Sequence, residues 1–265
     1  MGKLIDGSSL FIKERSERFN EESRKYTLSF TGGVRDNIIV RITGGCGYMS
    51  EQDAKGLYKL FVNAFCPEFA GAIIFGGTRM LKKDDPQIIV PGITEIPSLI
   101  VRGCLQASAL GIIPMTQDIK YNLSHGLIVS QSEEDDYVTV VHPEQKGCLM
   151  VQQSVDERVP WDIEYKECME IIKDYRHFAN WQSLLISYNG GGTTEKEIVA
   201  TAKMGWPIIL INGSGRKTEE YANNQDFLKS YPNVHVVEKE VSSLKEKLFE
   251  LGVISRDLSR VISLR

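Results

Sequence analysis

From residue 37 onwards, short apolar runs alternate with longer segments in which apolar residues recur every three or four positions. The run 37–43, Asn-Ile-Ile-Val-Arg-Ile-Thr, is rich in β-branched residues and predicts a buried strand. A helix is predicted to follow it, because Ser50 is a suitable N-cap and Asp53 stands at the carboxylate position of a capping box. Pro67 then ends the helical spacing.

The same order of strand, glycine turn and helix recurs towards the end of the chain. Further strands are predicted over 71–75, 111–115, 184–187, 207–211 and 234–237, and further helices over 95–110, 165–181, 195–204, 218–229 and 242–251. The strand runs are too apolar for a sheet with one exposed face, which indicates parallel βαβ units. The predicted fold class is therefore α/β: a Rossmann-like, doubly wound parallel sheet with helices on both faces.

Two segments depart from this order. Residues 1–36 are charged and polar, with an amphipathic stretch around Leu10–Phe19, and predict a lead-in helix and strand. Residues 119–160 hold short strand-like runs and predict an irregular insertion whose tips cover a ligand. We therefore expect a lead-in over 1–36 and a single domain over 37–265 that contains the insertion.

The composition is that of a globular chain. Of the 265 residues, 42% are hydrophobic and 25% are charged, which excludes a disordered or collagen-like protein. Lys and Arg number 31 against 35 Asp and Glu, for a net charge of −4. The chain thus lacks the basic surplus of nucleic-acid-binding proteins, and no nucleic-acid partner is expected. An anionic small molecule stays open, because backbone amides and helix N-termini bind phosphate without a positive surface.

Cysteines and histidines give no metal pattern. The 5 cysteines form no C-x-x-C pair, and their odd number favours reduced thiols. Cys46 is interpreted as a small buried thiol, since no His or Asn pattern supports a nucleophile. With 4 scattered histidines, we expect neither a metal site nor a cofactor. The polar N-terminus is unlike a signal peptide and no run approaches the roughly 18 apolar residues of a membrane helix, so we expect a cytoplasmic location.

Glycine-rich turns follow four of the predicted strands. Glycine allows positive φ and lets backbone amides approach a ligand closely. In a doubly wound sheet these turns all lie at the carboxyl ends of the strands, where ligands bind and where helix N-termini favour anions. Tight strand–helix turns are the alternative, but four turns at one edge favour phosphate binding. The candidate ligand-binding residues are Gly44, Gly45, Gly76, Gly77, Thr78, Arg79, Gly190, Gly191, Gly192, Thr193, Thr194, Glu197, Gly213, Ser214, Gly215 and Arg216.

The side chains beside these turns suggest separate roles. Arg79 and Arg216 each follow a glycine turn, where a guanidinium can hold a phosphate through two hydrogen bonds. Glu197 either accepts from ribose hydroxyls or is an ordinary first-turn glutamate that complements a helix dipole. No turn matches a P-loop or a G-x-G-x-x-G fingerprint in the right setting, so a dinucleotide dehydrogenase has little support.

Four motifs occur in the order seen in the SLOG superfamily, which the chain resembles over roughly residues 37–240. They are the strand ending in Gly-Gly-Cys-Gly at 41–47, Ile-Phe-Gly-Gly-Thr-Arg-Met at 74–80, Gly-Ile-Ile-Pro at 111–114 and Tyr-Asn-Gly-Gly-Gly-Thr-Thr-Glu-Lys-Glu at 188–197. The superfamily includes LOG-type nucleotide-processing enzymes and the LSDAT-type ligand-sensing domain of melastatin-type TRP channels. The closing stretch at 206–215, Trp-Pro-Ile-Ile-Leu-Ile-Asn-Gly-Ser-Gly, is more similar to the sensing branch.

The chain departs from the LOG enzymes in their fourth motif, P-G-G-x-G-T-x-x-E. Asn189 stands at the proline and Thr193 at the last glycine, whereas the other motif positions through Glu197 match. These enzymes also use an arginine on the preceding helix, where Arg176 is not in clear register. The departures favour binding over N-glycosidic cleavage.

The resemblance implies a protein that binds or senses a nucleotide-derived small molecule, such as an ADP-ribose-like or cyclic signalling nucleotide. A protein that sequesters this ligand without an effector is equally open. The alternative is a LOG-type nucleoside-monophosphate phosphoribohydrolase, in which Glu197 is the catalytic candidate. SLOG proteins commonly oligomerise, and the helices over 50–66 and 93–110 carry apolar residues on more than one face. We therefore also expect a homo-oligomer, and specifically a dimer.

Overall fold

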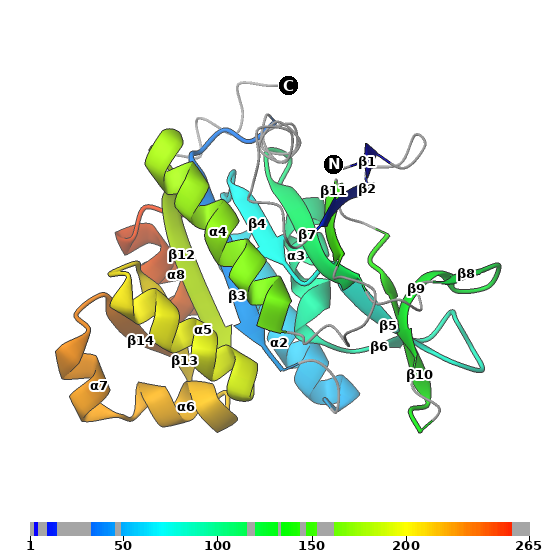
Figure 1. Cartoon of the computed structure of the whole chain (residues 1–265). Helices are drawn as coiled ribbons and strands as arrows, with labels where there is room; N and C mark the ends of the chain where they lie inside the picture. The colour runs from blue at the N-terminus through cyan, green and yellow to red at the C-terminus, as the bar shows by residue number, and fades with distance from the viewer. Residues whose placement is uncertain are drawn as a thin grey trace.

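A nine-stranded sheet runs through the centre of the molecule (Figure 1). In the order β1-β2-β11-β7-β4-β3-β12-β13-β14, all neighbours are parallel except the edge strand β1, which is antiparallel to β2. The computed structural model describes residues 3–4, 10–14, 33–45, 49–115, 120–131, 134–143, 147–152 and 162–255, and the statements below concern these residues. The strands are β1 (Lys3–Leu4), β2 (Leu10–Glu14), β3 (Ile38–Gly44), β4 (Ala72–Phe75), β7 (Ser108–Met115), β11 (Gly147–Gln152), β12 (Gln182–Tyr188), β13 (Ile208–Asn212) and β14 (Val234–Glu238).

Helices cover both faces of this sheet, which confirms the predicted α/β class (Figure 1). Ile38 and Val40 of β3 pack towards α2, α3 and α8, whereas Ile39, between them, packs towards α4. The sheet is therefore buried on both sides, as its apolar strands require. The helices are α2 (Glu51–Phe65), α3 (Ile96–Gly103), α4 (Asp162–Phe178), α5 (Gly192–Lys203), α6 (Arg216–Ala222), α7 (Gln225–Ser230) and α8 (Val241–Glu250), with the 3-10 turn η1 (Ile93–Glu95) before α3.

A second, five-stranded antiparallel sheet stands beside the first, on the right in Figure 1. Its order is β6-β5-β10-β9-β8, with β5 (Thr78–Lys82), β6 (Ile89–Val90), β8 (Lys120–Asn122), β9 (Gly126–Gln131) and β10 (Tyr137–Val141). The irregular part expected at 119–160 thus includes three strands of this sheet. Its extent needs correction, because β11 pairs in parallel with β7 in the main sheet and β5 joins the second sheet from earlier in the chain.

Three predicted elements differ in extent. The helix expected over 95–110 ends at Gly103, and β7 already begins at Ser108, because a buried apolar run is compatible with either structure. The helix expected over 218–229 is divided into α6 and α7, since the Asn224 side chain accepts from the backbone of Phe227 and starts a new helix. In the lead-in, Leu10–Glu14 is the strand β2 beside β11, while much of 1–36 lies outside the described residues.

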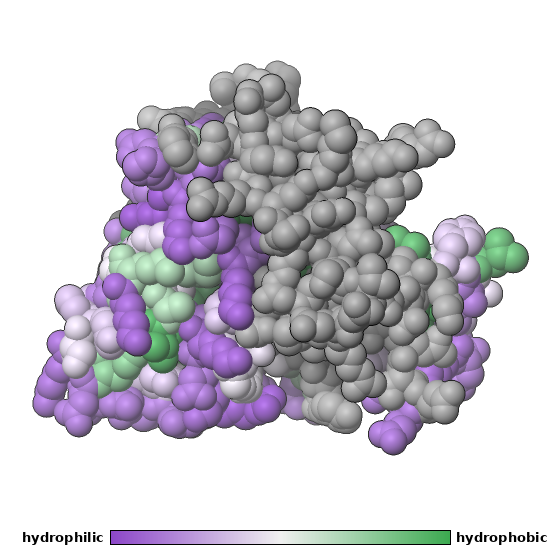
Figure 2. Space-filling view, viewed as in Figure 1, coloured by the Kyte–Doolittle hydropathy of each residue, from purple (hydrophilic) through white to green (hydrophobic). Residues whose placement is uncertain are grey.

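The apolar residues that suggested self-association lie mostly in the core. Leu57, Phe61 and Phe65 of α2 are buried, and Tyr58 hydrogen-bonds to Gly92. The surface over α6 and α7 is largely hydrophilic on the face shown in Figure 2. Packing within one chain thus explains the apolar residues of α2. Self-association therefore stays a prediction that rests on the resemblance.

Among the described residues, no helix has the length and apolar character needed to cross a membrane.

Candidate functional site

A cavity of about 400 Å³ lies at the carboxyl ends of β3, β4 and β12. The start of α5 and the turn η1 contribute to its walls, and strands β5 and β10 of the second sheet add Thr78, Met80, Tyr137 and Thr139. Its position is where a doubly wound sheet binds ligands. The lining residues are Arg41, Ile42, Thr43, Gly44, Gly45, Phe75, Gly76, Thr78, Met80, Ile93, Thr94, Tyr137, Thr139, Glu164, Gly191, Gly192, Thr193, Thr194, Glu197 and Arg216.

The cavity brings together most of the sequence-predicted ligand residues. Those that line it are Gly44, Gly45, Gly76, Thr78, Gly191, Gly192, Thr193, Thr194, Glu197 and Arg216. The predicted residues outside its lining are Gly77, Arg79, Gly190, Gly213, Ser214 and Gly215. The turns after β3 and β12 therefore face the cavity, whereas the turn after β13 contributes only Arg216.

The N-terminus of α5 opens into the cavity. Its N-cap residue is Gly191, which has no side chain to cap the first turn. Gly192, Thr193 and Thr194 follow Gly191 along the cavity wall. An N-terminus without a side-chain cap offers backbone amides and the positive end of the helix dipole to an anion. The guanidinium of Arg216 lies beside it, because Nη2 is 3.0 Å from the point where a Cβ on Gly191 would stand.

The turn before α5 is hydrogen-bonded to the segment that follows β13. The Ser214 hydroxyl accepts from the backbone N–H of Asn189 at 2.9 Å, and the backbone N–H of Thr218 donates to the Asn189 carbonyl at 3.2 Å. Gly190 has φ 88°, and a Cβ there would lie 2.2 Å from the Thr194 hydroxyl. Gly190 and Ser214 thus shape the cavity wall without lining the cavity.

A buried arginine with two carboxylates lines the cavity. Arg41 of β3 contacts Glu197 of α5 twice, from Nη2 at 2.9 Å and from Nε at 3.3 Å. The same Nη2 lies 2.8 Å from Oε1 of Glu164, near the start of α4. The side chains of Arg41 and Glu197 are 6% and 3% exposed, whereas that of Glu164 is 15% exposed. Glu164 is therefore the carboxylate of this cluster most open to a ligand.

One guanidinium shared by two carboxylates leaves excess negative charge in this cluster. Burial raises the pKa of Glu164, and the neighbouring Glu197 adds to this rise, which outweighs the opposing effect of Arg41. Burial disfavours the charged form of Arg41, but Glu164 and Glu197 reverse that effect and raise its pKa well above the ordinary value. The arrangement keeps Arg41 charged and makes Glu164 easier to protonate than an ordinary glutamate.

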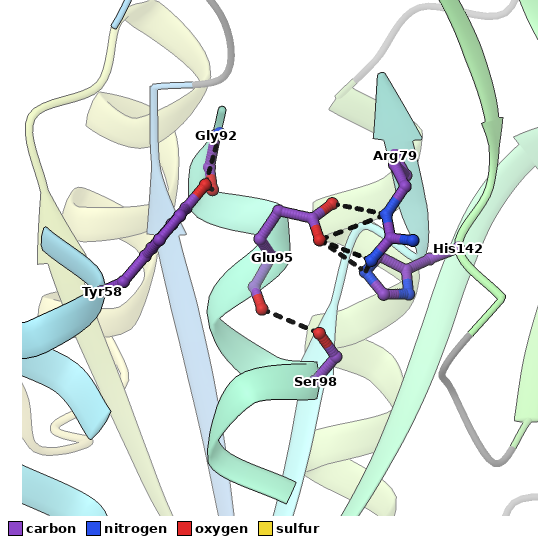
Figure 3. Close-up of polar contacts among 6 residues, drawn as sticks. All are labelled: Tyr58, Arg79, Gly92, Glu95, Ser98 and His142. Atoms are coloured by element: carbon purple, nitrogen blue, oxygen red, sulfur yellow. Dashed lines mark hydrogen bonds and ion pairs between the residues drawn. The ribbon is translucent and has the colours of Figure 1, made fainter. Parts of the chain in front are cut away.

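Arg79 is outside the lining of the cavity. Its side chain points towards Glu95 and His142 (Figure 3). Thr78 and Met80 line the cavity, and Arg79, between them on β5, projects to the other face of the strand. Its guanidinium pairs with Glu95 through Nε–Oε1 at 2.9 Å and Nη2–Oε2 at 2.6 Å. His142 Nε2 lies 3.1 Å from Nη2 of Arg79 and 3.3 Å from Oε2 of Glu95. This buried cluster joins the second sheet to the start of α3.

The arginine that meets Glu197 was missed by sequence reasoning. Arg176, at the end of α4, instead donates to the Ser183 hydroxyl at 3.0 Å and lies over the Trp206 ring. Arg41 carried a signal, because it is a charged residue inside an otherwise apolar strand and such a residue needs a buried partner. Glu164 had no comparable signal among the many polar residues of α4.

The described residues were also compared with the donor sets of metal sites. No group of three or more His, Cys, Asp or Glu side chains within the described ranges is arranged to hold a metal ion. Cys46 lies outside the described residues. The groups available for ligand chemistry are thus backbone amides, two arginines, two glutamates and the hydroxyls of the wall.

Three solved structures align with this chain over most of their length. The X-ray structure of TM1055, a structural genomics target, gives a TM-score of 0.46 at 16% identity, covering 80% of this chain and 98% of that one. A molybdenum cofactor binding protein from the phototrophic bacterium Rippkaea orientalis gives 0.45 at 14%, covering 82% and 98%. The Moco carrier protein from Chlamydomonas reinhardtii gives 0.41 at 11%, covering 82% and 98%.

At these identities and TM-scores, the alignments carry no conclusion about ligand or activity. No protein-family model and no curated protein matches the sequence.

Proposed function

We propose that this chain binds a phosphorylated, nucleotide-derived small molecule in the cavity, as a sensor or as a sequestering protein. The observation that carries the proposal is the N-terminus of α5, which has no side-chain cap and faces the cavity beside Arg216. Backbone amides, a helix dipole and a guanidinium together suit a phosphate or pyrophosphate. The SLOG assignment, with its sensing branch, belongs to the same proposal and rests on the order of the sequence motifs.

The carboxylates suit the sugar of such a ligand. Both oxygens of Glu197 already accept from Arg41, whereas Glu164 contacts Arg41 through one oxygen and is more exposed. The Glu164 carboxylate also lies 3.3 Å from the Cβ position of Gly76, at the cavity wall. We therefore assign ribose hydroxyls to Glu164, with Arg41 and Glu197 fixing its position.

The rest of the cavity suits a planar base. Phe75, Met80 and Ile93 give it apolar wall, and Tyr137 and Thr139 add polar groups from the second sheet. A volume of about 400 Å³ is within the range of small-molecule sites, which runs from about 300 to 1,000 Å³.

Mass spectrometry of the small molecules released from the denatured, purified protein tests this proposal directly. The expected result is a phosphorylated nucleoside derivative. Calorimetric titration with ADP-ribose and with AMP follows, comparing the parent with Gly191→Val. A side chain at Gly191 displaces the Arg216 guanidinium and covers the amides of α5, so affinity should fall by about tenfold or more.

The matched control is Gly56→Ala, an exposed glycine of α2 with no atom within 4 Å of its Cβ position. It should bind like the parent. Equal binding by Gly191→Val, while that variant stays folded, would place the ligand elsewhere.

The Arg41–Glu197 pair beside Glu164 favours a second candidate, an N-glycosidic hydrolase acting on nucleoside monophosphates. A carboxyl group with a raised pKa can protonate the base as its bond to the sugar carbon breaks. A water molecule adds to that carbon and gives a proton back to the carboxylate. Incubation with AMP would then release adenine and ribose 5-phosphate at a steady rate, and Glu164→Gln would abolish this release. Binding of AMP without any free base supports the binding role instead.

A further inference from the structure

Two cysteine thiols lie against each other at the ends of neighbouring helices. Cys66 is the C-cap of α2 and Cys104 is the C-cap of α3. Their sulfur atoms are 3.2 Å apart, with the Cys104 thiol placed to donate to Cys66 Sγ. A disulfide bond is about 2.05 Å long, so the two sulfurs need to approach by only about 1.2 Å.

The backbone around this pair is closely fitted to it. A Cβ on Gly103, next to Cys104, would stand 2.5 Å from Cys66 Sγ, so only glycine lets α3 approach the thiol this closely. The Cys66 thiol also lies 3.6 Å from the Ile100 carbonyl oxygen. The contact between the two sulfurs therefore belongs to the packing of α2 on α3.

The two thiols differ in access and in acidity. Cys66 is partly exposed, whereas Cys104 is buried. The hydrogen bond from Cys104 lowers the pKa of Cys66, against the opposing effect of burial. The same hydrogen bond, together with burial, raises the pKa of Cys104. Cys66 is thus the more nucleophilic thiol, and Cys104 is placed behind it to complete a disulfide.

We propose that Cys66 and Cys104 form a site of reversible thiol oxidation, in which hydrogen peroxide converts the pair into a disulfide that links α2 to α3. The Cys66 thiolate attacks one peroxide oxygen, the O–O bond breaks, and the other oxygen leaves and becomes water. The resulting Cys66 sulfenic acid is attacked by Cys104 sulfur, which gives up its proton. The S–O bond breaks and a second water leaves, so two sulfurs lose two electrons and the peroxide gains them.

This site is separate from the cavity but is connected to it along the chain. The helix α3 continues directly from η1, and Ile93 and Thr94 of that turn line the cavity. A disulfide would tether the far end of α3 to α2. Because the cross-link restricts the unfolded chain, the oxidised protein should melt at a higher temperature than the reduced one.

The test treats the folded, reduced protein with hydrogen peroxide, alkylates the remaining thiols and maps the proteolytic peptides by mass spectrometry. The expected product is a cross-linked pair of peptides containing Cys66 and Cys104, lighter by two hydrogen atoms and restored by dithiothreitol. Cys66→Ser and Cys104→Ala should each abolish it. Cys168→Ala should retain it, because Cys168 is a buried thiol with its Sγ 4.0 Å from a Glu164 oxygen rather than beside a sulfur.

Two results would overturn the proposal. In one, Cys66 is oxidised to the sulfinic acid or alkylated while Cys104 stays a free thiol. In the other, the only disulfides found join separate chains.

Discussion

Arg41 and Arg79 are both buried, and each holds a glutamate through two of its nitrogens, but their surroundings differ. Arg79 pairs with Glu95, and His142 lies beside both side chains. Arg41 is shared by Glu197 and Glu164, and this cluster faces the cavity. In the first cluster an arginine holds a carboxylate outside the cavity, whereas in the second an arginine lies between two carboxylates at the cavity wall.

The pKa values follow this difference in opposite directions. Burial alone would raise the pKa of Glu95, but hydrogen bonds from His142 and Arg79 outweigh it and lower the pKa. In the other cluster, burial and Glu197 raise the pKa of Glu164 despite Arg41. A carboxylate with a lowered pKa joins parts of the fold, while a carboxylate with a raised pKa at a cavity is available to a ligand or a proton.

The largest expected effect separates the two clusters by stability. Glu95→Ala removes a buried carboxylate that Arg79 holds through two nitrogens, so the free energy of unfolding should fall by about 3–5 kcal/mol. Glu197→Ala should cost less, because Arg41 keeps Glu164 at 2.8 Å. Urea unfolding at neutral pH measures both.

Glu51→Ala is the control for this prediction, since Glu51 is an exposed residue of α2 whose surface ion pair contributes at most about 1 kcal/mol. A cost for Glu95→Ala no greater than that of Glu51→Ala would show that the Arg79 cluster does not hold the two sheets together.

The second prediction separates the arginines by ligand affinity. Arg216 lines the cavity, and a charge-assisted hydrogen bond contributes about 1.5–3 kcal/mol, so Arg216→Ala should weaken ADP-ribose binding by roughly tenfold to a hundredfold. Its stability should stay within about 0.5 kcal/mol of the parent, because the residue is exposed. Lys203→Ala removes a positive charge at the other end of α5 and should not change affinity.

Calorimetric titration compares these variants. If Arg216→Ala and Lys203→Ala bind alike, the phosphate does not lie at the start of α5.

The different partners of Arg41 and Arg79 could not be predicted from the sequence. The parallel sheet and the turn before α5 were predictable, because strand, glycine and helix follow one another locally. Arg41 and Glu197 are 156 positions apart, and no local pattern pairs them. The position of Arg79 outside the cavity lining was not foreseeable, because the glycine turn before it leads into the strand β5 and strand alternation then turns its side chain away from the cavity.

The third prediction concerns the turn η1, which contributes residues to the cavity wall and to the Arg79 cluster. Gly92 precedes η1, which carries Thr94 to the cavity and Glu95 to Arg79. The Tyr58 hydroxyl accepts from the backbone N–H of Gly92 at 3.1 Å and lies 3.3 Å from its carbonyl oxygen. Tyr58→Phe should therefore lower the free energy of unfolding by about 0.5–1.5 kcal/mol.

Tyr121→Phe is the matched control, because that side chain is 73% exposed, and it should leave stability unchanged. Thermal and urea unfolding distinguish the two variants, and equal stability of both would remove the anchoring role of Tyr58.

The smallest effect is a change in pH dependence. Glu95 has a lowered pKa in the folded state, so its stabilising contribution is present above its unfolded pKa of about 4.3 and is lost as pH falls through the folded value. Glu164 has a raised pKa, so the folded state holds that proton more tightly, and stability falls as pH rises from about 4.3 through the folded value. Glu95→Gln should flatten the acid side of the stability profile, whereas Glu164→Gln should flatten the decline above it. Urea unfolding across the acid range measures both slopes. A change of the same sign in both variants would contradict the opposite pKa shifts of Glu95 and Glu164.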